Sequence, residues 1–208
     1  MEFSQRLNDI AKKAEAALEP MFRRVDEISF YNTNKIMDAF REHRVAATNF
    51  DTTSGYGYDD RGRDELDAIW ADVMGAEAAF VRHNIVNGTQ ALTIGLFGLL
   101  RPTDLMCSIA GKPYDTLEEV IGIAGEAGNG SLADFGVEYH QIDLLPDGTP
   151  DINAIRSELA WGNYKMAYIQ RSRGYSLRPS LTIDKIEELC ATVRDVSPNT
   201  VIMVDNCY

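Results

Sequence analysis

The feature that most constrains the fold is an alternation of short apolar segments with helical segments after residue 77. Because strands that alternate with helices form mostly parallel sheets with helices on both faces, the pattern predicts an α/β domain. The predicted strands are residues 78–82, 105–109, 137–143, 165–170 and 200–204, and the predicted helices between them are residues 89–100, 116–125, 152–160 and 183–196. Ligands in such domains bind beyond the carboxyl ends of the strands, so the residues after each strand are candidates for function.

The first 75 residues show a different pattern. Apolar residues at helical spacing in residues 3–17 and 32–44 predict a helical arm outside the main core. Residues 45–63 are rich in glycine, threonine and aspartate, which predicts a loop. A further helix is predicted over residues 64–75, with Gly75 as its stop signal.

Composition excludes some classes of partner. With a formal net charge of -12 and no long basic run, the chain should bind neither nucleic acid nor an anionic membrane surface. It lacks an apolar run of about 18 residues, and its N-terminus has helical periodicity, so we expect a cytoplasmic protein. Cys107, Cys190 and Cys207 are too widely spaced for a zinc site and predict plain thiols.

An anion site is predicted after the first strand. Asn87, Gly88 and Thr89 stand where a loop turns into an apolar helix. The free N–H groups of the first helical turn, together with the helix dipole, bind phosphate well, and the Thr89 hydroxyl adds a donor. The same residue types are also ordinary helix caps, and that alternative stays open.

Later strands end in further candidates. Tyr114 follows a rigid Lys-Pro turn, where its ring can stack on a planar ligand. Arg171, Ser172 and Arg173 follow the fourth predicted strand and have an anion-binding composition, although solvated surface charge would explain each arginine singly. Asp205 ends the last strand, and a protonated ring nitrogen would be a suitable partner for its carboxylate.

Other cofactors are disfavoured. The glycines of the segment GIAGEAGNG lack the spacing of a nicotinamide-binding loop and follow a helix instead of a strand. There is no phosphate-binding P-loop motif. His43, His83 and His140 are scattered, so no metal site is predicted.

The segments VNGTQAL, GKPYDTLEEVIG, IQRSRGYSLRPSLTI and VDNCY, in this order, resemble the aluminium-resistance or methionine gamma-lyase-like family of pyridoxal-phosphate proteins. The resemblance extends from about residue 22 to residue 208. It implies the large domain of fold type I pyridoxal-phosphate enzymes and relatedness to cystathionine beta- and gamma-lyases. It also suggests two parts: residues 1–63, a helical arm with a cofactor and dimer loop, and residues 64–208, the N-terminal portion of the cofactor-binding large domain.

The resemblance implies a role for each candidate residue. Pyridoxal 5'-phosphate would be held at its phosphate by Gly88, Thr89 and Gln90, at the face of its ring by Tyr114 and at its ring nitrogen by Asp205. Ser172 and Arg173 would also contact the cofactor, and Arg171 the carboxylate of the substrate. The segment GYGYDDRGR is similar to the loop that reaches a neighbouring subunit's phosphate in lyase relatives, which makes Tyr56, Tyr58 and Arg61 candidates.

In this family the lysine that binds the cofactor covalently lies after the segment VDN, whereas the chain's lysines all precede Asp205. We therefore expect an N-terminal fragment of a carbon-sulfur lyase of sulfur amino-acid metabolism, inactive alone, with the C-terminal part of the fold missing. The full-length protein should be a homodimer or homotetramer that acts on a small amino acid. The alternatives are a non-catalytic remnant or binding module and another fold type I activity, such as a transaminase.

Overall fold

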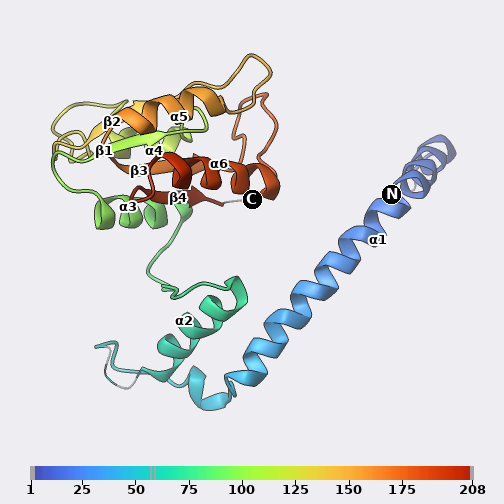
Figure 1. Ribbon diagram of the computed structural model, residues 1–208. Helices are drawn as coiled ribbons and strands as arrows, with labels where there is room; N and C mark the ends of the chain where they lie inside the picture. The colour runs from blue at the N-terminus through green and yellow to red at the C-terminus, as the bar shows by residue number, and fades with distance from the viewer. Residues whose placement is uncertain (1–2, 57, 59, 207–208) are drawn as a thin grey trace. The chain divides into compact units, whose positions relative to one another are not determined.

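The computed structural model describes residues 3–56, 58 and 60–206, and the chain divides into two compact units, Met1–Asn84 and Ile85–Tyr208 (Figure 1). In its described residues the first unit contains two helices and a short 3-10 turn, and the second unit contains the sheet. The sequence suggested another division, at residue 63, between a helical arm with a cofactor and dimer loop and the cofactor-binding domain. That division concerns function, which the fold of a single chain does not test, and it stays a prediction.

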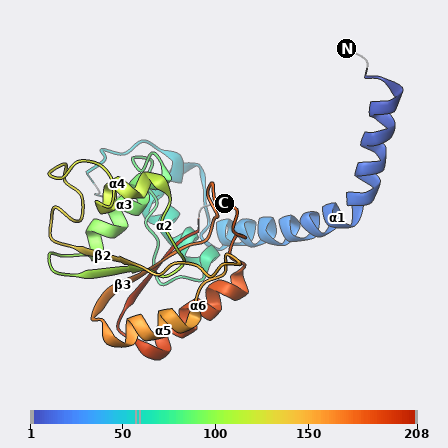
Figure 2. The same ribbon diagram turned by 90° about the horizontal axis from the view of Figure 1, so that it is seen from above.

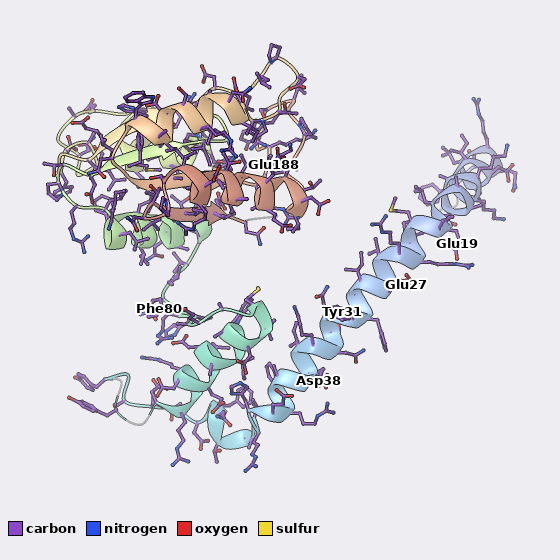
Figure 3. All side chains as sticks on the ribbon, in the orientation of Figure 1. Glu19, Glu27, Tyr31, Asp38, Phe80 and Glu188 are labelled. Carbon is purple, nitrogen blue, oxygen red and sulfur yellow. The ribbon has the colours of Figure 1, made fainter. Side chains whose placement is uncertain are left out.

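The first unit is built on one long helix. Residues that the sequence assigns to two helical stripes form a single helix, α1 (Gln5–Glu42), capped by the Ser4 side chain. Pro20 lies inside it and cannot donate an intrahelical hydrogen bond, and α1 bends in its N-terminal half (Figure 2). Its apolar side chains are largely exposed; Tyr31, for example, is 68% exposed and stands out from the helix (Figure 3).

A turn follows, η1 (Ala47–Phe50), and then α2 (Arg61–Met74), which Asp60 caps and Gly75 ends in the left-handed conformation. The strand predicted over residues 78–82 is wrong, because the structure forms no strand there. Side-chain contacts replace strand pairing: Asp67 accepts hydrogen bonds from the backbone N–H of Val81 and from the Arg82 guanidinium, which lies 4.5 Å from the centre of the Phe80 ring (Figure 3).

The second unit is a parallel α/β sheet. In chain order its elements are α3 (Gly88–Leu99), β1 (Leu105–Ser108), α4 (Asp115–Ile121), β2 (Glu138–Gln141), α5 (Ile152–Trp161), β3 (Tyr164–Gln170), α6 (Ile183–Val196) and β4 (Val201–Asp205). The four strands lie in the order β2-β1-β3-β4, and every neighbouring pair is parallel. Their carboxyl ends therefore meet at one edge of the sheet, where the predicted α/β architecture places its ligands.

Helices cover both faces of this sheet, as predicted (Figure 2). Met106, Met166 and Tyr168 point to the face packed by α3 and α4. Cys107 and Ala167, one residue away on the same strands, point to the face packed by α5 and α6. Successive side chains of a strand point in opposite directions, so two apolar faces require continuous apolar strands.

The two cysteines that the structure describes carry free thiols, Cys107 buried and Cys190 half-buried, whereas Cys207 lies outside the described residues. Burial raises the pKa of the Cys107 thiol to about 12. Across the described parts of the chain, none of the helices combines the length and apolarity needed to cross a lipid bilayer.

Candidate functional site

A cavity of about 440 Å³ opens in the second unit at the carboxyl edge of the sheet. It lies between the N-terminal ends of α3 and α4 and the segment that follows β3. The residues that line it are Gly88, Thr89, Leu92, Tyr114, Thr116, Leu117, Ser172, Arg173, Gly174, Tyr175, Ser180 and Asp205. Of the candidates from the sequence, it brings together Gly88, Thr89, Tyr114, Ser172, Arg173 and Asp205.

The first turn of α3 is closed by two side chains. Asn87 caps the helix, its Oδ1 atom accepting from the N–H of Gln90 at 2.8 Å. The Gln90 Oε1 atom in turn accepts from the N–H of Val86 at 2.8 Å. Gly88 and Thr89 lie between these caps, and N–H groups of a first turn have no intrahelical acceptor. The cap and the anion site are thus compatible: Gln90 shapes the turn, and the N–H groups of Gly88 and Thr89 remain to meet an anion.

A residue that the sequence analysis did not select joins the two helices beside the cavity. The hydroxyl of Thr116, in the first turn of α4, lies 2.8 Å from the hydroxyl of Thr89. Either oxygen can donate to the other. Because both residues line the cavity, this pair presents a second polar group next to the N-terminus of α3. Its position follows Tyr114 by two residues, but no sequence pattern links it to Thr89.

An aromatic wall closes one side of the cavity. The rings of Tyr114 and Tyr175 are stacked, with their centroids 5.8 Å apart and their planes at 26°. Gly174, which precedes Tyr175, has a φ of 57°, the left-handed region that glycine adopts most easily. A Cβ atom at Gly174 would lie 3.1 Å from Cδ2 of Tyr114. Glycine therefore lets the segment after β3 approach the Tyr114 ring.

A carboxylate lies at the end of β4. Asp205 is 8% exposed and pairs in register with Gln170 of β3. Its backbone carbonyl accepts from the N–H of Arg171 at 3.0 Å, and its Oδ2 atom accepts from the Tyr168 hydroxyl at 3.4 Å. These contacts hold an acidic side chain at the cavity wall, within the segment where the sequence predicted a functional acid.

The arginines of the segment after β3 differ in their placement. Arg173 lines the cavity, whereas Arg171 does not. The Arg171 side chain donates to Oδ1 of Asn206 at 2.8 Å and to the carbonyl of Leu181 at 3.3 Å. Its role at a substrate carboxylate stays a prediction.

Arg178, which the sequence analysis passed over, is 9% exposed and supports this segment from within. It donates to the carbonyls of Gln170, Ser172 and Pro179. Burial lowers the pKa of its guanidinium. An arginine that follows a leucine and precedes a proline gives no sequence signal of such a role.

Three candidates belong to the first unit. Tyr56 and Tyr58 are each 82% exposed in the loop before α2, and Arg61 is the exposed first residue of that helix. Exposed aromatic rings next to an arginine are available to another molecule. Their proposed contact with a neighbouring subunit's cofactor stays a prediction.

The glycine-rich segment GIAGEAGNG, which lacks the spacing of a nicotinamide-binding loop, donates hydrogen bonds to a nearby carboxylate. The N–H groups of Gly128, Gly130 and Ser131 donate to the Asp134 carboxylate at 2.8 to 3.0 Å. These bonds lower the pKa of Asp134, the bond from Gly128 most strongly. These three N–H groups of the loop therefore bind a carboxylate of the same loop.

Comparison with known proteins gives consistent results. The methionine gamma-lyase family matches residues 7–208. The chain is 44% identical over 202 residues to the uncharacterized protein YnbB of Bacillus subtilis, covering 97% of this chain and 48% of that protein. The solved structure of a carbon-sulfur lyase involved in aluminium resistance from Clostridium novyi is 40% identical, with a TM-score of 0.93, covering 99% of this chain and 49% of that one. The chain thus spans about half the length of these relatives.

A more distant structure shares the fold alone. The pyridoxal-5'-phosphate dependent protein YhfS of Escherichia coli has a TM-score of 0.62 at 20% identity, over 85% of this chain and 43% of that chain. The α/β fold of the chain is therefore shared with a pyridoxal-phosphate protein, as the sequence resemblance implied. Because the family matches residues 7–208 and the Bacillus subtilis relative aligns with 97% of the chain, the chain belongs to the methionine gamma-lyase family.

Proposed function

We propose that this chain forms the cofactor-binding part of a pyridoxal 5'-phosphate-dependent carbon-sulfur lyase that acts on a sulfur amino acid. One observation carries the proposal: a helix N-terminus, an aromatic wall and a carboxylate meet in one cavity, through Thr89, Tyr114 and Asp205. The names of the family and of the Clostridium novyi relative support the type of reaction.

The residues of the cavity fit the chemistry of this cofactor. The N–H groups of Gly88 and Thr89, with the paired hydroxyls of Thr89 and Thr116, suit a dianionic phosphate. The Tyr114 ring suits the face of a pyridine ring. Asp205 suits a protonated ring nitrogen, because the attraction between a carboxylate and a cation is stronger where little water screens it, and Asp205 has a low exposure. A cavity of about 440 Å³ is in the range usual for small-molecule sites.

When bound, this cofactor supplies an electron sink for the carbanion at the substrate's alpha carbon. The chain's own residues bind and orient it. In this proposal Asp205 keeps a proton on the ring nitrogen, and Ser172 and Arg173 provide polar contacts from the segment after β3. Gln90 acts indirectly, because its side chain holds the turn at Val86. Arg171 would meet the substrate carboxylate only after leaving Asn206 and Leu181.

We assign the covalent attachment of the cofactor to a lysine outside these 208 residues. Among the described residues, none that lines the cavity is a lysine. Lys112 instead pairs with Glu118 at 2.8 Å, and Lys185 pairs with Glu188 at 2.5 Å. The length of the relatives, about twice that of this chain, leaves room for the missing group. The chain alone should then bind the cofactor without catalysing turnover.

The complete protein would be a homodimer or homotetramer in which Tyr56, Tyr58 and Arg61 reach the cofactor phosphate of a neighbouring subunit. Their exposure supports this role, because each side chain is available for contact with another molecule. This role is tested by comparing the complete protein with its Arg61→Ala variant. Light scattering measures the mass of each assembly, and absorbance measures the cofactor that each retains. The variant should assemble like the unaltered protein but retain less cofactor.

Cofactor binding is tested with pyridoxamine 5'-phosphate, which has no aldehyde and so cannot react with surface lysines. Isothermal titration should give one site per chain, and Thr89→Ala should weaken it. Thr93→Ala is the matched control, since the Thr93 hydroxyl donates to the carbonyl of Thr89 inside α3 instead of joining the Thr89 and Thr116 pair. Absence of binding, or equal weakening by both variants, would contradict the proposed site.

The reaction is tested on a chain extended to the length of its relatives. With pyridoxal 5'-phosphate and cystathionine, cysteine or methionine, it should consume water and release a thiol or sulfide, ammonia and a keto acid. Transfer of the amino group without loss of sulfur would instead assign a transaminase. Borohydride reduction followed by peptide mapping should label a lysine beyond residue 208, and label on Lys112 would overturn the assignment.

A further inference from the structure

A buried tyrosine lies directly behind the carboxylate of the cavity. Tyr168 is 0% exposed, and its hydroxyl donates to Oδ2 of Asp205 at 3.4 Å. The two residues come from neighbouring strands: Tyr168 is in register with Met203, two residues before Asp205, so both side chains lie on the same face of the sheet. Tyr168 itself is not among the residues that line the cavity.

The Tyr168 ring is held by close packing. It belongs to the core cluster under α3 and α4, with Leu96, Met106 and Leu117 as other members. A ring enclosed in this way cannot move its hydroxyl without disturbing the core. Burial, and after it the charge of Asp205, raise the pKa of Tyr168 far above its ordinary value, so the hydroxyl keeps its proton and remains a donor.

We propose that Tyr168 is a positioning residue that, through its hydrogen bond to Oδ2, holds the Asp205 carboxylate in the orientation that pairs with a protonated ring nitrogen. This inference rests on the proposed function, and it assigns a part in cofactor binding to a residue of the core that does not line the cavity. A neutral donor also replaces, for one carboxylate oxygen, a hydrogen bond to water that burial removes.

The test compares two ligands on the purified chain. Pyridoxamine 5'-phosphate has a phosphate, an aromatic ring and a ring nitrogen, whereas phenyl phosphate lacks the nitrogen. Tyr168→Phe should weaken pyridoxamine 5'-phosphate about fivefold, the effect expected for one net hydrogen bond, and leave phenyl phosphate unchanged. A role in packing alone would weaken both ligands equally.

Tyr164→Phe is the matched control. Tyr164 begins β3 and is 5% exposed, and its hydroxyl contacts Nδ1 of His140 at 2.6 Å and Oε1 of Glu158. Tyr164→Phe removes a hydroxyl from the same strand without removing a contact of Asp205, so affinity for both ligands should be unchanged.

A double substitution tests whether Tyr168 acts through Asp205. In chains carrying Asp205→Asn, the further change Tyr168→Phe should cost less than twofold, because the carboxylate that it positions is gone. Equal affinity of Tyr168→Phe and the unaltered chain for pyridoxamine 5'-phosphate would overturn the inference alone. An unaltered chain that does not bind pyridoxamine 5'-phosphate would overturn both the proposed function and this inference.

Discussion

Thr89 and Thr116 begin two different helices, and their hydroxyl oxygens lie 2.8 Å apart at the wall of the cavity. The contact joins the first turn of α3 to the first turn of α4, and it presents two hydroxyls where an anion would meet the N-terminus of α3. The pair therefore connects the packing of the second unit with its proposed phosphate site.

Thr116→Val should weaken pyridoxamine 5'-phosphate binding by about two- to twelvefold, because the Thr89 hydroxyl loses the partner that orients it, and a net hydrogen bond is worth about 0.5 to 1.5 kcal/mol. Isothermal titration measures the change. Thr116→Ser keeps a hydroxyl and should restore most of the affinity. Unchanged affinity in the valine variant would show that Thr89 needs no such partner.

Gly174→Ala should lower both stability and ligand affinity. The left-handed φ of 57° is strained for alanine, and the new Cβ would lie 3.1 Å from the Tyr114 ring. We expect a loss of about 1 kcal/mol in the free energy of unfolding, measured with urea, together with weaker pyridoxamine 5'-phosphate binding.

Gly98→Ala is the control for the Gly174 variant. Gly98 lies in α3, and a Cβ there meets no described atom within 4 Å. Alanine should stabilise the helix by up to about 1 kcal/mol and leave binding unchanged. If Gly98→Ala and Gly174→Ala shifted binding alike, the account of Gly174 would fail.

Arg178→Met should destabilise the second unit by about 2 kcal/mol or more, because the carbonyls of Gln170, Ser172 and Pro179 lose a buried donor. Arg171→Met removes a more exposed arginine with two contacts and should cost about 1 kcal/mol or less. Urea unfolding of both variants compares them. An equal loss in the two would contradict the supporting role of Arg178.

His43 should make the first unit more stable in mild acid. Its imidazole lies 2.5 Å from Oδ2 of Asp72 and 2.5 Å from Oε1 of Glu65, and these two hydrogen bonds, that of Asp72 first, raise the pKa of His43 above its ordinary 6.5. Because the folded state binds the proton more tightly than the unfolded state, the stabilisation is fully present below about pH 6.5 and is lost as pH rises through the folded-state pKa.

Thermal unfolding followed by circular dichroism across this pH range measures the His43 effect. The unaltered chain should lose stability of its helical first unit as pH rises above the ordinary histidine pKa. His43→Gln, which cannot be protonated, should show a flatter profile. A variant profile parallel to that of the unaltered chain would exclude His43 as the source.

Local sequence was sufficient for several features. The apolar runs at 105–109 and 165–170 predicted parallel strands because a strand covered on both faces needs apolar side chains in both directions. Asn87 predicted the start of α3, because a cap depends on residues that are neighbours in the chain. Asp205 could be selected because it follows an apolar strand.

Other features depended on contacts between distant residues. The apolar segment 78–82 predicted a strand, yet Asp67, fifteen residues before Arg82, binds it in another conformation. The two apolar stripes before residue 45 gave no sign that a single helix contains both of them. Whether a helix continues through a proline such as Pro20 depends on the helical turns on both sides of it.

For this chain, then, the sequence by itself determined the type of domain and the strand ends at which function was to be sought. The tertiary structure decided which side chains meet there: Thr116 beside Thr89, Arg178 under Ser172, and Tyr168 behind Asp205. The physical reason is that periodicity and capping act between neighbours in the chain. The partner of a buried polar group depends on strand order and packing, which bring together residues as far apart as Tyr168 and Asp205.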